Sequence, residues 1–307
     1  MIDILLSIYN GSKYIEQQLE SLVAQTFTDW RVLMRDDGSR DGTISILNDY
    51  CGRMPERFVL LSDNNTNLGP CQSFSRLMVA STAPYIMFCD QDDVWLPNKV
   101  ESTLAAMRQT EREHDRETPI LVHTDLTVTD EDLNLIADSF WRYQAIDPQL
   151  IGLNRILLGN VVTGNTIMIN RRLVDLACPI PSAAIMHDWW IAIIASALGC
   201  TVAQEKSAIL YRQHDQNKLG AVCWNRARVL SCFVNLSNAK QAVVNAQNQA
   251  GAFLQKHRNL LAPEQIQLVS IFTHLAEKGP LTRRYLLLKH GLLKNNLIKN
   301  LGLLLVV

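Results

Sequence analysis

The chain has 307 residues, 48% of them hydrophobic and 19% charged, which is enough for one large or two small domains with a sizeable core. Its formal net charge of −1 excludes an overall field that would attract nucleic acid. The seven cysteines form no CxxC pair, and their odd number argues against a disulfide framework and fits a reducing cytoplasm. We expect a cytoplasmic protein, because no signal peptide and no apolar run of about 20 residues is recognisable.

Short apolar runs alternate with amphipathic stretches over the first hundred residues. The runs predict strands over 4–8, 30–34, 58–61 and 85–89, and the stretches predict helices over 15–23, 44–50 and 69–81, with a fourth helix starting at Pro97. Ser12 and Asp41 are the expected caps of the first two helices. Strand–helix alternation with nearly all-apolar strands indicates a parallel sheet covered on both faces.

The second half of the chain continues with weaker signals. The charged stretch 108–117 is typical of a solvated helix end and a surface link. Further strands are expected over 120–128, 166–169 and 208–211, and a helix over 189–198. From Asn225 to the end the pattern is helical.

Two polar clusters follow predicted strands, where parallel sheets bind their ligands. Asp90-Gln91-Asp92 comes after the apolar run 85–89, and two carboxylates at a sheet edge can hold a hard divalent cation. A solvated acidic turn that caps the next helix explains the same spacing equally well. The second cluster, Asp36–Thr43, has six polar or glycine positions in a row, more than a capping turn needs, so its carboxylates are candidates for binding a base or a ribose.

Several motifs together carry a family resemblance. They are Ser7-Ile8-Tyr9-Asn10-Gly11, the segment 21–27, the cluster 36–43, Asn67-Leu68-Gly69, Asp90-Gln91-Asp92-Asp93-Val94-Trp95-Leu96-Pro97, Thr163-Gly164-Asn165, His187-Asp188-Trp189-Trp190 and Tyr211-Arg212-Gln213-His214. In this order they resemble glycosyltransferase family 2. The set, and especially Asp90–Trp95 and Tyr211–His214, resembles its rhamnosyltransferase-like branch, which builds bacterial surface polysaccharides. One departure is the segment 72–74, where many relatives carry an arginine.

The resemblance implies an α/β fold of the GT-A type, Rossmann-like with a mostly parallel sheet and flanking helices, followed by a C-terminal helical extension. It implies a catalytic domain over 1–220, with a nucleotide-sugar-binding half over 1–115 and an acceptor-binding half over 116–220, and a helical region over 221–307. The implied activity is inverting transfer of a sugar, with L-rhamnose from dTDP-rhamnose as the expected donor. The implied acceptor is a hydroxyl of a saccharide or of a polyprenyl-linked saccharide.

The same resemblance implies site residues and a divalent metal, Mg²⁺ or Mn²⁺, which carboxylate oxygens do not distinguish. Asp188 is the implied catalytic base, and Asp92 and His214 are the implied metal residues. The implied donor-binding residues are Ser7, Tyr9, Asn10, Asp36, Asp37, Ser39, Asp90 and Gln91. The candidate acceptor-binding residues are Trp95, Thr163, Gly164, Asn165, His187 and Trp189.

Structural interpretations compete with several of these roles. Asp188 precedes a predicted helix and could serve only as its N-cap. Histidines such as His187 and His214 are often structural, and tryptophans such as Trp95 and Trp189 more often belong to a core than stack on sugars. Thr163-Gly164-Asn165 fits a tight turn as well as an acceptor pocket.

The C-terminal third alternates basic and apolar residues, with Arg283, Arg284, Lys289, Lys294 and Lys299 among leucines. A basic amphipathic helix can lie on an anionic membrane surface. The same pattern fits a pair of helices that packs on the catalytic domain with solvated lysines, and the sequence leaves both open.

Two other functions fit parts of the sequence. An aspartyl-nucleophile phosphatase would use Asp90 as nucleophile and Asp92 as acid and base, but it leaves the cluster 36–43 unexplained. A non-catalytic nucleotide-sugar binder would give Asp188 no chemical role. A dehydrogenase is disfavoured, because no GxGxxG follows the first strand.

Overall fold

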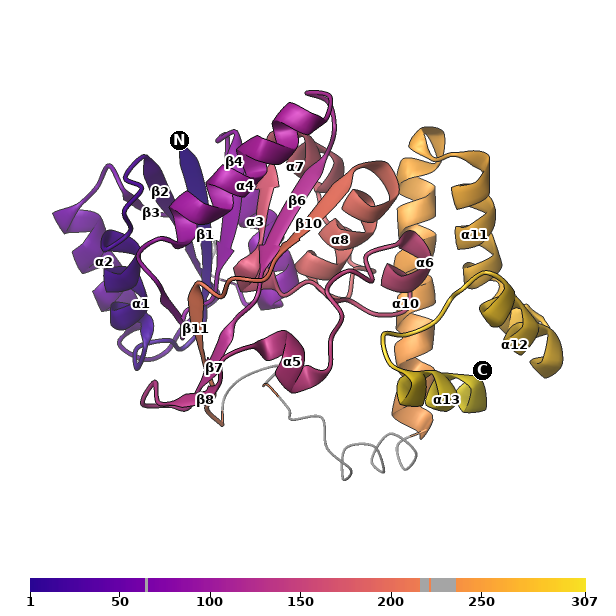
Figure 1. Cartoon of the computed structure of the whole chain (residues 1–307). Helices are drawn as coiled ribbons and strands as arrows, with labels where there is room; N and C mark the ends of the chain where they lie inside the picture. The colour runs from indigo at the N-terminus through magenta and orange to yellow at the C-terminus, as the bar shows by residue number, and fades with distance from the viewer. Residues whose placement is uncertain (64–65, 216–220, 222–235) are drawn as a thin grey trace.

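The computed structural model describes residues 1–63, 66–215, 221 and 236–307. Its main sheet has the strand order β10-β6-β9-β4-β1-β2-β3 (Figure 1). These strands are β1 (Ile2–Ile8), β2 (Trp30–Asp36), β3 (Phe58–Leu60), β4 (Tyr85–Cys89), β6 (Ile120–Thr124), β9 (Met168–Asn170) and β10 (Cys200–Gln204). All neighbours pair in parallel except β9, which is antiparallel to β4 and to β6.

A smaller sheet has the order β5-β11-β7-β8. It consists of β5 (Val94–Trp95), β11 (Ile209–Arg212), β7 (Thr127–Thr129) and β8 (Leu135–Ala137). The antiparallel pairing of β5 with β11 joins the segment after β4 to the segment that ends at Arg212, although the two lie more than a hundred residues apart in the chain. This pairing brings the two halves of the predicted site together.

The helices of the α/β part are α1 (Ile15–Val23), α2 (Thr43–Arg53), α3 (Gly69–Ala80), α4 (Lys99–Glu113), α5 (Phe140–Gln144), α6 (Leu153–Ile156), α7 (Arg171–Ala177) and α8 (His187–Leu198), with the 3₁₀ turn η1 (Gly164–Thr166). The C-terminal elements are α10 (Leu236–His257), η2 (Arg258–Leu260), α11 (Pro263–Thr273), η3 (Leu275–Glu277), α12 (Pro280–Lys289) and α13 (Leu297–Val306). Within the described residues, no helix is long and apolar enough to span a membrane.

The two faces of the sheet form two apolar cores, because successive side chains of a strand point to opposite sides. Leu5 of β1 packs into one core with residues of α3, α7 and α8, and the C-terminal helices extend this core. Ile4 and Leu6 pack into the other core with residues of α1, α2 and α4. The alternation explains why the strands of the first hundred residues are apolar almost throughout.

Several element boundaries differ from the sequence predictions. The N-cap of α1 is Tyr14 rather than Ser12, and the N-cap of α2 is Gly42, although Asp41 accepts a bond from the backbone N–H of Thr43 at 3.0 Å. Pro97 does not start α4, which begins two residues later at Lys99.

The strand predicted over 120–128 is split into β6 and β7. A helical pattern was also predicted from Asn225 onward, and its first part, up to residue 235, lies outside the described residues.

Candidate active site

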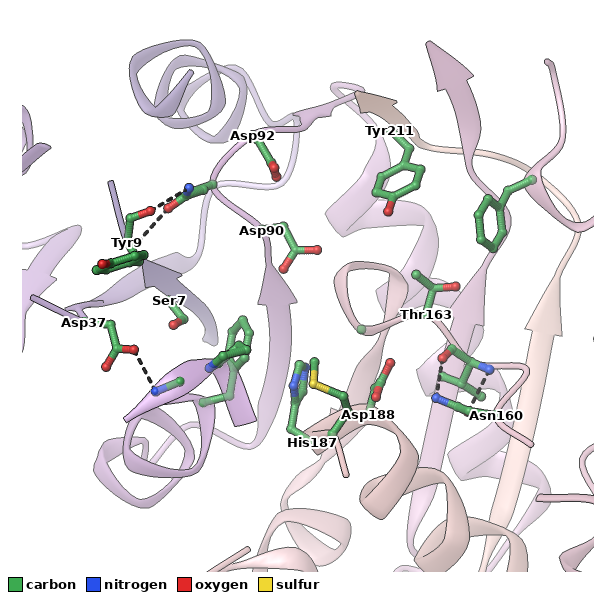
Figure 2. Close-up of a pocket in the computed structure, with 18 of the residues that line it drawn as sticks. Ser7, Tyr9, Asp37, Asp90, Asp92, Asn160, Thr163, His187, Asp188 and Tyr211 are labelled. Carbon is green, nitrogen blue, oxygen red and sulfur yellow. Dashed lines mark hydrogen bonds between the residues drawn. The ribbon is translucent and has the colours of Figure 1, made fainter. Parts of the chain in front are cut away.

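The carboxyl ends of β1, β2 and β4 open into one cavity of about 840 Å³. Ile8 pairs with Asp36, and Leu6 pairs with Cys89, so the residues that follow these strands lie at the same edge of the sheet. The cavity is lined by residues from both halves of the α/β part, as Figure 2 shows. Its position matches the general site of ligand binding in open parallel sheets.

Ser7, Tyr9 and Asp37 line one end of the cavity. The carboxylate of Asp37 accepts bonds from the backbone N–H of Leu68 and of Gly69, each at 2.8 Å, and holds the loop that enters α3 against the cavity (Figure 2). This loop turns at Gly69 with φ +73°, a conformation that a side chain would strain. We refer to this part of the cavity as the donor end.

Gln91 ties the first and fourth strand ends together. Its side-chain oxygen accepts the backbone N–H of Tyr9 at 2.8 Å, and its amide nitrogen donates to the Tyr9 carbonyl at 3.1 Å. A Cβ on Gly11 would lie only 2.8 Å from the Gln91 Oε1 atom, so a larger residue here would displace the Gln91 amide. The amide bridge leaves the Tyr9 ring, on a residue that is 47% exposed, at the mouth of the cavity.

Arg35 is buried beneath the donor end and is the main residue that the sequence reasoning missed. Its guanidinium bonds Asp37 Oδ1 at 2.5 Å, Asp63 Oδ2 at 2.5 Å and Ser73 Oγ at 3.1 Å. Ser73 lies in the segment 72–74 of α3, where the family resemblance leads us to expect an arginine. In this chain the guanidinium of Arg35, from β2, reaches that segment instead. The available signal was an arginine directly after the apolar run 32–34, since a buried arginine needs carboxylate partners.

Three carboxylates from two distant segments face the middle of the cavity. Asp90 and Asp92 follow β4, Asp188 lies in the first turn of α8, and all three point toward the same space in Figure 2. Burial, together with the nearby charges of Asp92 and Asp188, raises the pKa of Asp90 to about 7. The carboxyl groups of Asp90 and Asp188 therefore resist deprotonation in this cavity, and a bound cation would favour their charged forms.

Asp188 is held by the backbone at the start of α8. Its Oδ1 accepts the N–H of Trp189 at 2.6 Å, and the N-cap of the helix is Met186, so Asp188 is not the N-cap residue. Burial raises the pKa of Asp188 to about 7, although the backbone N–H groups of Trp189 and Gly164 oppose this shift. A carboxyl group with such a pKa can take up a proton near neutral pH.

Asp92 and His214 meet at the wall between the main cavity and a smaller one of about 340 Å³. His214 Nε2 lies 2.9 Å from Asp92 Oδ2, and its ring lies 4.8 Å from the ring of Tyr14. The Asp92 carboxylate suits Mg²⁺ or Mn²⁺, whereas the His214 imidazole is a better ligand for a transition metal such as Mn²⁺ than for Mg²⁺. Within the described residues, no group of three His, Cys, Asp or Glu side chains is arranged to hold a metal ion alone.

Thr163, Gly164 and His187 line the opposite end, which we call the acceptor end. A Cβ on Gly164 would lie 2.9 Å from His187 Nε2, so the glycine allows the imidazole to pack closely against this turn. His187 packs on the rings of Phe74 and Phe88 and is 3% exposed, and burial lowers its pKa to about 3. Neither ring nitrogen has a hydrogen-bond partner within the described chain, and both are buried.

The acceptor end is completed by residues that the sequence analysis did not select. They are mostly apolar or aromatic and come from α5, from the loop before η1 and from β11, namely Phe140, Gln144, Ile146, Asn160, Val161, Val162 and Tyr211. No local motif marked them, because their positions depend on the folding of the second half over the sheet edge.

Three predicted acceptor residues do not line the cavity. Trp95 is 2% exposed and packs in the second core, so its predicted contact with the acceptor is wrong. Asn165 is fully buried and donates its amide N–H to Asp93, which stabilises the interior. The indole N–H of Trp189 donates to the Ile156 carbonyl at 2.6 Å, so this ring connects α8 to α6.

Three predicted donor residues shape the turns around the donor end without lining the main cavity. Asp36 is 3% exposed, and its Oδ2 accepts the backbone N–H groups of Gly38 and Ser39 at 3.0 and 2.9 Å. The Ser39 hydroxyl accepts the backbone N–H of Asn10 at 2.8 Å. Asn10 lines only the smaller cavity, at φ 49°.

Residues 3–114 match the model of the family described as Glycosyl transferase family 2. Over this segment the chain is similar to glycosyltransferase family 2. The dTDP-rhamnosyl transferase RfbG of Shigella flexneri is 24% identical over 223 residues, which cover 70% of this chain and 74% of that protein. The chain spans a smaller part of three other curated relatives, namely 38%, 30% and 57% of their length.

Solved structures extend the likeness beyond the matched family 2 segment. TarS 1-349 of S. aureus in complex with UDP-GlcNAc superposes with a TM-score of 0.55 at 14% identity, over 99% of this chain and 90% of that one. The mannosyltransferase PcManGT of Pyrobaculum calidifontis, in complex with GDP-Man and Mn²⁺, superposes with a TM-score of 0.52 at 14% identity. This match covers 94% of this chain and 79% of that one. The fold is therefore α/β of the GT-A type with a helical C-terminal region, as the sequence predicted.

Proposed function

We propose that the protein is an inverting, metal-dependent glycosyltransferase that acts in bacterial surface polysaccharide synthesis. The observation that supports this most strongly is the placement of Asp188 opposite Asp90 and Asp92 in one cavity whose other end is built by Ser7, Tyr9 and Asp37. Such a cavity can hold a nucleotide at one end, a diphosphate in the middle and an acceptor at the other end.

In this proposal the donor nucleotide lies at the donor end, where Tyr9 offers a ring face and Ser7 and Asp37 offer polar groups. The sugar then lies between Asp90 and Asp188. Asp188 accepts the proton of the acceptor hydroxyl as that oxygen attacks the anomeric carbon from the side opposite the leaving diphosphate. One displacement inverts the configuration of that carbon, and the pKa of about 7 lets Asp188 take the proton at neutral pH.

Asp92 and His214 would hold a divalent cation, Mg²⁺ or Mn²⁺, at the diphosphate. When bound, the cation would stabilise the negative charge of the departing nucleoside diphosphate. The fit rests on the chemistry of the two side chains and on the excess of carboxylates, which burial and mutual repulsion make unfavourable without a counter-ion.

For the donor we propose L-rhamnose carried by dTDP. The likeness to RfbG over 70% of this chain supports this choice. The acceptor would be a hydroxyl of a saccharide or of a polyprenyl-linked saccharide, bound against Thr163, Gly164 and His187. The division into a donor half over 1–115 and an acceptor half over 116–220 remains part of the proposal, and the cavity draws its lining from both halves.

Isothermal titration calorimetry tests the nucleotide site. Purified protein would be titrated with dTDP and UDP, with and without Mn²⁺ or Mg²⁺. We expect metal-dependent binding that favours dTDP, at least tenfold weaker in Asp92→Asn and in Asp37→Ala. The exposed Asp49 on α2 provides a matched control, because Asp49→Asn removes a carboxylate far from the cavity and should leave binding unchanged.

Two outcomes would reject the proposal in different ways. Absence of binding for both nucleotides with either metal would remove the nucleotide site and favour the aspartyl phosphatase, which uses only Asp90 and Asp92. Normal binding without turnover for any nucleotide sugar would favour a non-catalytic binder.

A further inference from the structure

The helix α12 carries an apolar ridge that nothing in the described structure covers. Leu281, Tyr285 and Leu288 are 80%, 59% and 57% exposed. Their spacing of four and three residues places them on one face of the helix, while Leu287 on the opposite face is fully buried. A helix that is already anchored by its buried face thus presents a second apolar face to the outside.

The neighbouring helix α13 repeats this arrangement. Leu301 and Leu305 are 51% and 60% exposed, whereas Leu303 is 2% exposed. Arg284 of α12 donates from Nε to the Leu304 carbonyl at 2.8 Å and connects the two helices. Figure 1 shows α12 and α13 at the margin of the molecule, on the side away from α1 and α2. We call the exposed residues Leu281, Tyr285, Leu288, Leu301 and Leu305 the apolar ridge.

The charge around the apolar ridge is strongly asymmetric. Residues 278–307 contain six Lys and Arg residues and no Asp or Glu, whereas the whole chain has a net charge of −1, so residues 1–277 carry −7. Lys278 and Lys289 are exposed next to the ridge, and Lys289 Nζ lies 5.7 Å from the Tyr285 ring centroid. Leucines and an aromatic ring bordered by cations are the pattern of a helix that lies in a membrane interface.

We infer that the apolar ridge and its lysines dock the protein on the surface of an anionic lipid membrane. A second copy of the chain fits less well, because a twofold interface would bring the same cationic patch against itself. Anionic headgroups match the basic border, and the acyl boundary accepts the leucines and Tyr285.

The segment between α12 and α13, the helices that carry the ridge, contacts a segment that leads to the acceptor end. Asn154 of α6 donates from Nδ2 to the Gly291 carbonyl at 3.0 Å, and Arg155 donates from Nη1 to the Lys294 carbonyl at 3.5 Å. A few residues later the same segment lines the cavity at Asn160–Gly164. The segment 154–164 therefore joins the helices that carry the ridge to the lining of the acceptor end. That a docked protein would take a lipid-linked acceptor there rests on the proposed function, whereas the docking itself does not.

Vesicle co-sedimentation tests the docking without any enzymatic activity. The full chain would be mixed with vesicles of phosphatidylcholine alone or of phosphatidylcholine with 30% phosphatidylglycerol. We expect binding to the anionic vesicles at least tenfold stronger than to the neutral ones, and a further tenfold weakening when salt rises from about 50 to 500 mM.

Matched variants distinguish vesicle binding through the apolar ridge from nonspecific binding through other exposed apolar residues. Leu281→Ser/Tyr285→Ser/Leu288→Ser should bind anionic vesicles at least tenfold more weakly, and Lys278→Gln/Lys289→Gln should lose most of the preference for anionic lipid. The control Val79→Ser/Leu135→Ser changes two residues that are 60% and 66% exposed elsewhere and should bind like the unaltered chain. Thermal unfolding of each variant checks that it remains folded.

The inference is overturned if the unaltered chain stays in solution with anionic vesicles, or if the folded triple variant sediments equally well. Light scattering adds a third decisive outcome. A dimer that dissociates in the triple variant, without vesicle binding by the unaltered chain, would assign the ridge to self-association. Because nucleotide titration and sedimentation are independent, failure of the proposed function leaves this test valid.

Discussion

Asp188, Asp90 and Asp92 are the residues on which the chemistry depends, and their environment sets how they respond to pH. Burial is the main cause of the raised pKa of both Asp90 and Asp188, and neighbouring carboxylates add to it at Asp90. Position after a buried strand made Asp90 and Asp92 candidates from the sequence, whereas Asp188 was a candidate only through the family resemblance. Their convergence on one cavity depends on contacts between distant segments.

His123 gives a separate prediction about acid stability. It is fully buried on β6, both ring nitrogens lack partners within the described residues, and burial lowers its pKa to about 4. Between pH 6.5 and pH 4 the unfolded chain binds a proton that the folded chain does not, so stability falls as pH falls through this window. The loss between pH 7 and pH 5 from this group should be about 1–2 kcal/mol.

Urea unfolding of His123→Leu at the two pH values measures this contribution. Between pH 7 and pH 5 the free energy of unfolding should fall less in the variant than in the unaltered chain, and the difference should be about 1–2 kcal/mol. His114→Leu, at an exposed position after α4, is the control and should keep the original pH response. An unchanged acid response in His123→Leu would contradict the assignment.

Other residue roles could not be obtained from the sequence, because they depend on tertiary pairing. Trp95 looked like a sugar-stacking residue, but its strand pairs with β11 and its ring becomes part of the core. Asn165 looked like part of an acceptor loop, but Asp93 takes its amide N–H in the interior. Arg35 was overlooked, because its partners Asp63 and Ser73 come from two later segments.

At the scale of elements, the junction between α8 and β10 depends on a glycine. A Cβ on Gly199 would lie 1.9 Å from the Pro119 carbonyl oxygen, a backbone atom that also accepts the N–H of Cys200 at 2.9 Å. Gly199→Ala would have to displace β10 from the start of β6. We expect a loss of about 3 kcal/mol in the free energy of unfolding.

Gly52 is the matched control, because it lies inside α2 and its added Cβ would meet no atom within 4 Å. Gly52→Ala should stabilise the chain by about 0.5–1 kcal/mol, since glycine is unfavourable within a helix. Urea denaturation measures both variants. If Gly199→Ala unfolds at the same urea concentration as the unaltered chain, the close packing at this junction is refuted.

The elements of the first hundred residues could be predicted because their signals are local. The apolar run 85–89 coincides with β4, and the helix expected over 69–81 is α3 with one residue fewer. β10 was missed because Cys200–Gln204 is half-buried along its whole length and has no clear alternation. The short strand β5 has only two residues and gains its identity from its partner β11.

At the scale of the whole molecule, the two cores and the C-terminal helices connect the site to the rest of the chain. α10 packs on α8, where the Phe253 and Trp190 rings lie 6.3 Å apart and the backbone N–H of Ile185 donates to Gln249 Oε1 at 2.8 Å. The C-terminal region therefore packs against α8, the helix that carries Asp188. The sequence indicated a helical region here, but its contact with α8 required the structure.

The central claim is that Asp188 is the base of a sugar transfer, and the most direct measurement is the rate of nucleoside diphosphate release from dTDP-rhamnose and other nucleotide sugars. The assay would run from pH 5.5 to 8.5 with Mn²⁺ or Mg²⁺, with water as the acceptor, for the unaltered chain and for Asp188→Asn. Because Asp188 must be deprotonated to act, the rate should rise about tenfold per pH unit below a pKa of about 7 and level off above it.

Asp188→Asn should bind the donor with a similar dissociation constant and release nucleoside diphosphate at least about a hundredfold more slowly at every pH. Equal rates for Asp188→Asn and the unaltered chain would contradict the account at its centre.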